Sequence, residues 1–479
     1  MTVSVSEVPA AHSAPRRMSN GALIAVLVAA SLPVMSFFGV NVALGQIGAE
    51  LHASPAVLQL VVATYGITYA SLVVIGGRLG DAFGRRRMIQ LGLGGFAVAS
   101  VLCSIAQSPG QLVAARLIQG VAAALIAPQV LATIHASNEG HHRDRAVGMF
   151  GATAGVATSI AFLVAGALTS SGVDWLGWRA VFWVTAPVAV VVMFAVARWM
   201  PDVRGHSRPQ LDLAGVVLLG AAMTLLIGPL TEGRAVGWPA WTWFALAAFV
   251  PVAIGFGWWQ RRAERTGGMP LVPPSMLAMR SMAVGLAIGA PFFTAFGGFM
   301  FVYALCAQSS GMSPLETGVS LLPMSVSFLF ASIVAGRLVA RFGVSVLTIG
   351  AVLAALGYAA VGYAVQQNDP SHVATVLPAM MVCGLGVGLV WSPLFGIVLS
   401  QVPAERAGLG SGILITTLQL FLGLGAAVVG SLYLGLVPGR GASDAFGQTL
   451  LPLAIAMLVI AGLTRALVPR RERDVATVG

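Results

Sequence analysis

The chain contains no lysine, and charged residues of every kind make up only 9% of its 479 positions. Soluble globular domains carry about 25% charged residues. Apolar residues instead reach 57% of this chain. They recur in runs of about 20, the length of helix that crosses the hydrocarbon core of a bilayer. The composition therefore excludes an ordinary soluble protein and predicts an all-α protein that crosses the membrane many times.

Cysteines and clustered basic residues are scarce as well. Cys103, Cys306 and Cys383 each fall inside an apolar run, so the sequence offers neither a disulfide framework nor a zinc cluster. The net charge of +10 comes from arginines scattered between the runs, which does not make the basic surface of a nucleic-acid-binding domain. We also find no phosphate-binding loop and no nucleophile–base set. We therefore expect no enzyme, no cofactor, no metal site and no nucleic-acid partner.

The apolar runs predict fourteen membrane spans. They lie at roughly 22–44, 57–77, 88–106, 112–134, 146–168, 180–197, 213–230, 241–259, 283–307, 318–339, 346–365, 373–399, 409–436 and 450–468. Two loops rich in arginine and proline separate them into groups of six, two and six. The predicted parts are a tail at 1–21, a six-helix bundle at 22–200, a linker with two extra helices at 201–282, a six-helix bundle at 283–468 and a tail at 469–479.

The arginines predict the orientation of these spans, because loops rich in positive charge stay in the cytoplasm. Arg16 and Arg17 precede the first span directly, which argues against a cleaved signal peptide. With the N-terminus inside, 22 of the 26 basic residues fall on the inner side and three on the outer side, while Arg116 lies within a span. The split predicts a multi-pass protein of the cytoplasmic membrane with both termini in the cytoplasm.

A short internal repeat predicts a duplicated half. Gly77–Gly84 reads GRLGDAFG and Gly336–Gly343 reads GRLVARFG, with a constant offset of 259 residues. Both copies follow the second span of a six-span group. Many transporters are built from such repeats, with the substrate site between them.

The first copy has the residues of a conformational latch. Its glycines allow close helix packing, and its aspartate lies beside arginines where it can form an ion pair or meet a helix N-terminus. We predict that these contacts hold the cytoplasmic side closed. The alternative is that the arginines only anchor orientation, which leaves the aspartate and the glycines unexplained. The predicted latch residues are Gly77, Asp81, Gly84, Arg85 and Arg86.

Arg116 is the basic residue within a span, and Gln119 follows one turn later. An arginine at the centre of a bilayer costs about 2.5 to 3.5 kcal/mol, so such residues usually face a bundle interior or a wet cavity. The alternative is that the side chain extends to the outer membrane surface. The pairing with Gln119 favours an interior position.

Together these motifs resemble the major facilitator superfamily over nearly the whole chain. The loop GRLGDAFGRRR and the span LVAARLIQGVAAALIAP are similar to two of its signatures, and GWRAVFWVTAPVAV is similar to the start of its sixth span. SPLETGVSLLP and VPAERAGLGSG resemble the second half of its fourteen-span drug:proton antiporter branch. The resemblance implies the major-facilitator fold and transport by alternating access. AFLVAG at Ala161–Gly166 departs from the branch's fifth-span pattern, which weakens the inference of export direction and of antiport but not that of the fold.

A second departure concerns acidic residues. None lies in the middle of a span, and the seven histidines map to tails or loops. Where the resemblance implies an aspartate in span one, five residues before the asparagine of VNVAL, this chain has Ser36. The predicted cavity therefore lacks an evident proton carrier. Its candidate lining residues are Ser36, Asn41, Tyr65, Arg116, Gln119, Phe293, Tyr303, Trp391 and Gln419, although ordinary packing explains each aromatic better than a ligand contact does.

These observations predict a secondary active transporter that exports a neutral or anionic small molecule, a drug or metabolite. The expected partners are that substrate and the bilayer, with protons as a candidate, and the chain is expected to act as a monomer. Two alternatives stay open. One is a conventional proton-coupled multidrug antiporter that uses Asp81, Glu232 or another carboxylate near the membrane surface. The other is a transporter-derived sensor or assembly protein that no longer transports.

Overall fold

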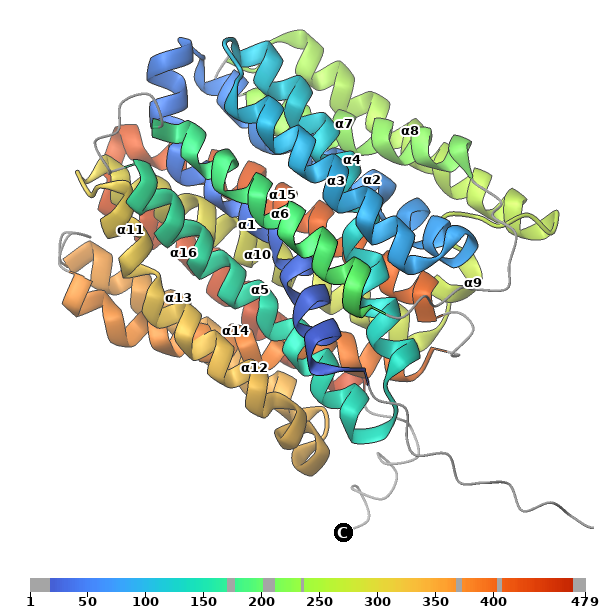
Figure 1. Cartoon of the computed structure of the whole chain (residues 1–479). Coiled ribbons are helices and arrows are strands. Elements are labelled where there is room, and N and C mark those ends of the chain that lie inside the picture. Colours follow the sequence, from blue (N-terminus) through green and yellow to red (C-terminus); the bar gives the residue numbers. More distant parts are fainter. Residues whose placement is uncertain are drawn as a thin grey trace, which may run out of the picture.

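The computed structural model describes residues 18–169, 177–200, 212–233, 237–367, 373–402 and 407–467. The regular elements in these ranges are helices (Figure 1). They are α1 (Asn20–Leu51), α2 (Pro55–Phe83), α3 (Arg85–Ser104), α4 (Pro109–Ser137), α5 (Gly140–Thr169), η1 (Gly177–Arg179), α6 (Ala180–Trp199), α7 (Leu213–Glu232), α8 (Ala240–Arg265), α9 (Pro274–Leu277), α10 (Arg280–Ser309), α11 (Pro314–Ser320), α12 (Leu322–Phe342), α13 (Ser345–Gln367), α14 (Val373–Ser400), α15 (Ala407–Arg440), α16 (Ala442–Leu463) and η3 (Thr464–Leu467).

Fourteen stretches of the described helices are long and apolar enough to cross a bilayer, which confirms the predicted number of spans. One of them runs through both α11 and α12. Several helices are longer than their apolar runs, and α1 continues to Leu51 before His52 adopts a left-handed conformation at φ 52°. The apolar run therefore locates each helix but does not mark its ends.

Serine–proline pairs begin three of the helices. Ser54, Ser108 and Ser313 precede the prolines that start α2, α4 and α11, and each serine side chain accepts a hydrogen bond from a backbone N–H of the first turn. Proline suits the first turn because its φ is already helical and it needs no hydrogen-bond acceptor there. These local signals fix where the three helices start.

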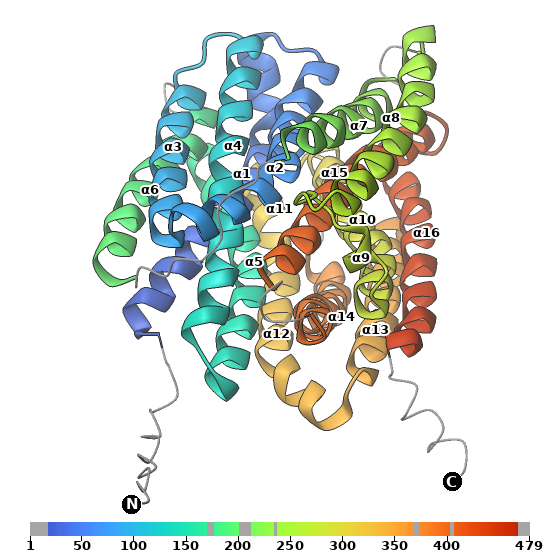
Figure 2. The same ribbon diagram turned by 90° about the vertical axis from the view of Figure 1, so that its right-hand side faces the viewer.

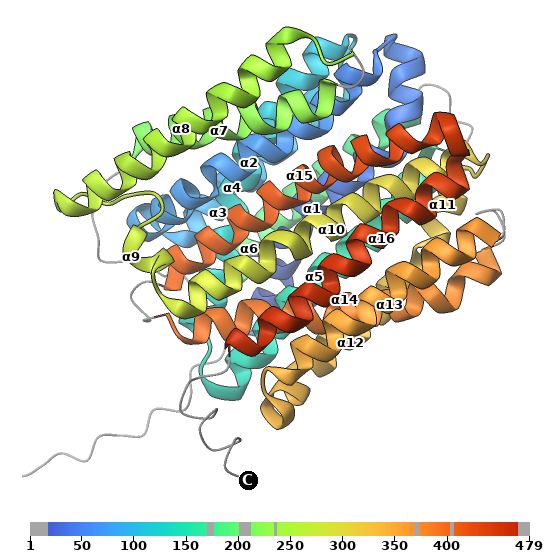
Figure 3. The same ribbon diagram turned by 180° about the vertical axis from the view of Figure 1, so that it is seen from behind.

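The helices pack as two groups joined by shared contacts. In the first group α2 packs against α4, α3 against α4 and α6, and α1 against α5. In the second, α10 packs against α15, and α13 against α14 and α16. The groups meet where α2 contacts α15 and where α5 contacts α11 and α12. The helices α7 and α8 lie along one edge, where α7 contacts both α2 and α15 (Figures 2 and 3).

Small residues allow the closest of these contacts. A side chain at Gly76 would collide with the backbone of Ala124, so α2 and α4 cannot accept a larger residue there, and one at Gly80 would displace the side-chain amide of Gln129. Across the two groups, a side chain at Gly155 of α5 would overlap Phe328 of α12. In lipid, where helices gain little from burying apolar surface, such close approach is a main source of association.

The segment after α8 is fastened to the first group by polar contacts. Arg78, near the end of α2, donates hydrogen bonds to the backbone carbonyls of Met269 and Pro270. Asp212, which caps α7, accepts from the backbone N–H of Leu271 at 3.1 Å. The side-chain oxygen of Gln260 accepts from the next N–H at 2.9 Å. These contacts fix the position of the α7–α8 pair at the edge of the bundle.

Candidate functional site

Cavities lie between the described helices, and three of them bear on function. The start of α1 and the end of α16 lie at one end of the bundle, which we call the terminal end (Figure 2). The outer cavity, of about 320 Å³, lies between α1, α2, α7, α10 and α15, toward the opposite end. The central cavity, of about 70 Å³, is bounded by helices of both groups. The terminal cavity, of about 770 Å³, lies between α4, α5, α12 and α14.

A polar cluster surrounds Arg116 inside the first group. The residue is 0% exposed, so its side chain does not reach the membrane surface. Its Nη1 donates hydrogen bonds to Ser36 Oγ at 2.8 Å and to Gln119 Oε1 at 2.6 Å. Its Nε donates to the carbonyl of Val61 at 3.1 Å, and its guanidinium lies 4.1 Å from the centre of the Tyr65 ring. The structure places Arg116 in the interior of the bundle, as predicted.

This buried cation is stabilised by neutral groups. No carboxylate of the described chain pairs with Arg116, and its Nη2 atom is buried without a hydrogen-bond partner. Gln119 extends the network by donating from Nε2 to Ser100 Oγ at 2.9 Å. Hydroxyl and amide dipoles, with the face of an aromatic ring, offset part of the cost of desolvating the guanidinium. Because the cluster holds no acid, it cannot exchange a proton through a carboxylate.

The predicted lining residues divide between the cavities and the helix interiors. Asn41 lines the outer cavity, Trp391 the central cavity, and Gln419 both. Ser36, Tyr65, Arg116 and Gln119 have at most 1% exposed surface and form the cluster around the guanidinium instead. Their part in binding or coupling stays a prediction.

Tyr303 and Phe293 are packed within the second group. The Tyr303 hydroxyl donates to Ser320 Oγ at 2.7 Å, and its ring is stacked 5.9 Å from that of Phe299. The Phe293 ring lies 5.1 Å from Trp391, which also contacts the rings of Phe292, Phe296 and Phe328. Trp391 is therefore the edge of an aromatic cluster that reaches the central cavity.

The predicted latch residues contact one another within the first group. Asp81 forms an ion pair with Arg85, Oδ1 to Nη2, at 3.0 Å, and Arg85 Nη1 donates to the carbonyl of Ala132 in α4 at 2.6 Å. Arg86 Nη2 donates to the carbonyl of Ala197 in α6. Gly84 has φ 95°, a conformation that favours glycine, at the turn between α2 and α3.

In the described part of the chain, the side-chain hydrogen bonds of Asp81, Arg85 and Arg86 stay within the first group. Arg85 lines the terminal cavity, whose wall also includes residues of α4, α5, α12 and α14. Of the motif glycines predicted to allow close packing, Gly80 lies against the side chain of Gln129, whereas a side chain at Gly77 would meet Pro128 at 3.6 Å, an ordinary contact.

The histidines correct one expectation. They were expected in tails or loops, but His135 lies in the last turn of α4 and lines the terminal cavity with Arg143 and Arg85. His142 lies in α5, near its start. The helices extend past the apolar runs by one or two turns, which brings these residues into helical structure.

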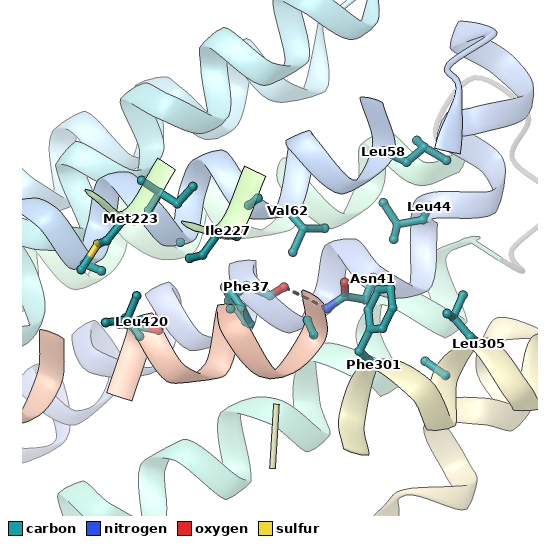
Figure 4. A pocket seen from close by; sticks show the side chains of 18 of the residues that line it. Phe37, Asn41, Leu44, Leu58, Val62, Met223, Ile227, Phe301, Leu305 and Leu420 are labelled. Atoms are coloured by element: carbon teal, nitrogen blue, oxygen red, sulfur yellow. Dashed lines mark hydrogen bonds between the residues drawn. The ribbon is translucent and has the colours of Figure 1, made fainter. Parts of the chain in front are cut away.

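Sequence reasoning also missed the contribution of α7. Met223 and Ile227 line the outer cavity with Phe37 and Phe301 (Figure 4). The sequence of α7 is apolar on every side, so no periodicity shows which of its faces packs inward. Its neighbours α2 and α15 decide that, and they are distant in the sequence.

Comparisons with known proteins extend these observations. A family model described as the Major Facilitator Superfamily matches residues 26–426. A protein named "Probable actinorhodin transporter" from Streptomyces coelicolor is 35% identical over 438 residues, which cover 91% of this chain and 76% of the relative. The puromycin resistance protein pur8 of Streptomyces alboniger is 31% identical over 441 residues, covering 90% of this chain and 86% of the relative.

A solved structure supports the fold independently. The crystal structure of the human organic anion transporter MFSD10 matches with a TM-score of 0.64 and covers 93% of this chain and 99% of that protein. The two sequences are only 14% identical, so this likeness concerns the fold alone. The helical arrangement is therefore shared with a protein whose sequence has diverged almost completely.

Proposed function

The chain belongs to the major facilitator superfamily, and from that membership we propose that it exports a neutral or anionic small molecule by alternating access. Membership makes it a multi-pass membrane transporter rather than an enzyme. In the proposed mechanism the bundles at 22–200 and 283–468 rock about the central cavity, while the segment at 201–282 links them. We further propose that the chain acts as a monomer in the cytoplasmic membrane with both termini inside.

One observation carries this proposal. The central cavity is bounded on one side by α1, α2, α4 and α5 and on the other by α10, α12, α14 and α15. A site shared by two bundles changes its access when one bundle tilts against the other, which is what alternating access requires. The terminal cavity lies beside the central cavity. Its presence supports a conformation of the protein that is open toward the terminal end. The names of the two bacterial relatives, a transporter and a resistance protein, support the outward direction and a drug-like or metabolite substrate.

The proposal can be tested with the purified full chain in proteoliposomes, using actinorhodin as the probe. We expect saturable, protein-dependent movement of actinorhodin, and little movement of ethidium, a permanent cation. Liposomes that contain the Asp81→Asn variant provide the control for leakage through damaged membranes. Equal movement in liposomes with and without protein, for actinorhodin and for puromycin, would contradict export as the function.

A second candidate is conventional proton-coupled export, and His135 favours it. Histidine is the side chain that ordinarily changes charge near neutral pH, and this one lines the terminal cavity. An imposed pH gradient across the same proteoliposomes separates the two candidates. If His135 carries the proton, His135→Gln should abolish the acceleration by the gradient while leaving downhill exchange of actinorhodin intact. If the gradient has no effect on the unmodified protein, proton coupling is excluded. Export would then be either uncoupled or coupled to something other than protons.

A further inference from the structure

The helix α7 supplies one wall of the outer cavity. Met223 and Ile227 are four residues apart and therefore lie on one face of the helix. They are 2% and 3% exposed, whereas Leu213 and Val217 are 65% and 69% exposed. Figure 4 shows both inward side chains across the cavity from Leu420 of α15. One face of α7 thus belongs to the cavity, although the helix itself lies at the edge of the bundle.

Two small residues hold this face in place. The hydroxyl of Ser71 in α2 lies 3.5 Å from the sulfur of Met223, within hydrogen-bond distance for that pair. Gly423 of α15 lies beside Ile227, whose terminal methyl would make an ordinary contact of 3.8 Å with a side chain there. The inward face of α7 is therefore positioned by one helix from each group.

Two residues that line the cavity have side-chain oxygens without a hydrogen-bond donor. The amide nitrogen of Asn41 donates to the carbonyl of Phe37 at 3.2 Å, which leaves its oxygen buried without a partner (Figure 4). The side-chain oxygen of Gln419, a residue that is only 5% exposed, is also buried without a partner. A buried polar atom without a hydrogen bond costs about 1 to 3 kcal/mol. A ligand that carries a donor would remove that cost.

The cavity walls favour an uncharged ligand. None of the described residues that line the outer cavity is charged. An ion transferred into such surroundings loses its hydration without gaining a counter-charge. An anion would face the unpaired oxygens of Asn41 and Gln419, and a cation would share the first group with the buried charge of Arg116. The volume of about 320 Å³ falls within the usual range for small-molecule sites.

We propose that the outer cavity binds an uncharged, mainly apolar molecule that carries a hydroxyl or N–H donor, and that α7 selects it through Met223 and Ile227. This inference rests on the proposed export function and names the ligand class of the outer cavity alone, not that of the central or terminal cavity. It also gives the extra helix pair a part in substrate selection, beyond linking the two bundles.

The test measures ligand protection of a single cysteine in the purified full chain. Ile227→Cys places a thiol in the cavity wall, while the natural cysteines Cys103, Cys306 and Cys383 are buried. N-ethylmaleimide is the label. The probes share one ring system: 1-naphthol, 1-methoxynaphthalene, 1-naphthalenesulfonate and trimethyl(1-naphthyl)ammonium. We expect 1-naphthol to protect the thiol. Because 1-methoxynaphthalene lacks the hydrogen-bond donor, we expect it to give the same protection only at an about tenfold higher concentration. The two ions should not protect.

Val217→Cys is the matched control, because it lies on the same helix but on the exposed face. None of the probes should protect that thiol. Equal protection at both positions would show partitioning into the lipid or detergent and overturn the proposal. Protection of Ile227→Cys by either ion as effective as that by 1-naphthol would also overturn it, as would no protection by 1-naphthol.

A second pair of variants tests the same cavity by filling it. With Met223→Cys as the reporter, Ile227→Trp should raise the 1-naphthol concentration needed for protection by at least about tenfold, since it occupies ligand volume. Val217→Trp should leave that concentration unchanged, and an equal effect of the two tryptophans would overturn the proposal. Transport without protection would contradict this inference alone, whereas protection without transport of any probe would contradict the export function.

Discussion

Ser36 Oγ lies 2.8 Å from Nη1 of Arg116, so a neutral hydroxyl stands beside a guanidinium that is 0% exposed. The same hydroxyl donates to Gln119 Oε1 at 3.0 Å, so the side chains of Ser36 and Arg116 both donate to this one oxygen. A carboxylate at position 36 would neutralise the guanidinium, whereas serine leaves the positive charge in place. The first group of helices therefore carries an uncompensated buried cation, and this should decide which ligands the neighbouring cavities accept.

We predict weak recognition of permanent cations and a gain on Ser36→Asp. A buried positive charge repels a cation in surroundings of low dielectric, and an aspartate at position 36 would pair with Arg116 and cancel that repulsion. In a host without its own efflux pumps, the unmodified chain should give little protection against quaternary ammonium dyes. The Ser36→Asp variant should give more.

Ser36→Asn is the matched control, since it adds a polar group of similar size without charge. It should behave like the unmodified chain in the dye assay. Robust export of these dyes by the unmodified chain, with acidification of the interior, would show that the missing carboxylate does not limit cation transport.

Arg116→Lys should lower transport by at least about tenfold at near-normal abundance. The guanidinium bonds Val61, Ser36 and Gln119 in three directions, while an ammonium is a compact charge that cannot span them. Each hydrogen bond to a charged group contributes about 1.5 to 3 kcal/mol. Transport of actinorhodin per unit of protein is the measurement. Arg145→Lys, an exposed site near the start of α5, is the control, and full activity of both variants would show that only the charge at position 116 matters.

Asp81→Asn should abolish or strongly slow transport while leaving abundance near normal. Its ion pair with Arg85 is partly exposed, and such pairs stabilise a fold by about 0 to 1 kcal/mol. We predict that the variant loses stability only in the conformation whose terminal end is closed. A cysteine placed at Gly336, which lines the terminal cavity, should therefore react faster with a water-soluble maleimide in this variant. Glu139→Gln, at an exposed position, should change neither the labelling rate nor the transport rate. If Asp81→Asn also left both rates unaltered, the latch hypothesis would be wrong.

Reporter fusions test the predicted orientation. A reporter fused after Gly479 should give a cytoplasmic signal, and one inserted after residue 236, between α7 and α8, should give an external signal. The expectation follows from the uneven distribution of arginines, most of which lie in the loops assigned to the cytoplasm. An external signal from the C-terminal fusion would contradict the orientation.

Much of the fold could be predicted because the membrane restricts the alternatives. A backbone in hydrocarbon must satisfy its own hydrogen bonds, so each apolar run of sufficient length has to form a helix. The fourteen runs were therefore readable from the sequence. The interior position of Arg116 followed from the cost of exposing an ion to lipid.

The walls of the cavities could not be predicted in the same way. A helix that is apolar on all sides, such as α7, gives no periodic signal for the face that carries Met223 and Ile227. Tyr303 was a candidate for the cavity because it is an aromatic with a hydroxyl, but it donates to Ser320 inside the second group. Its position depends on how α10 packs against α11 and α16, which no local pattern records.

The last prediction concerns the pH dependence of the contact at Asp212. Partial burial raises the pKa of this carboxyl group, but hydrogen bonds from Trp259, Gln260, Gly215 and Leu271 outweigh it and hold the pKa below its ordinary value. Since the folded pKa is depressed, the stabilisation is fully present above the unfolded pKa, which is about 3.9 for aspartate. It is lost as the pH falls through the lower, folded pKa.

Asp212→Asn should therefore lower the midpoint of thermal unfolding by the same amount at every pH between about 5 and 8, and by less below about pH 4. The loss should correspond to about 1 kcal/mol, below the range of about 1.5 to 3 kcal/mol for hydrogen bonds to a charged group, because water partly screens this half-buried carboxylate. Asp444→Asn, an exposed site in the first turn of α16, serves as the control and should show no such difference. If the Asp212→Asn difference instead grew as the pH fell, the carboxyl group would be more stable protonated, and the cap of α7 would not depend on its charge.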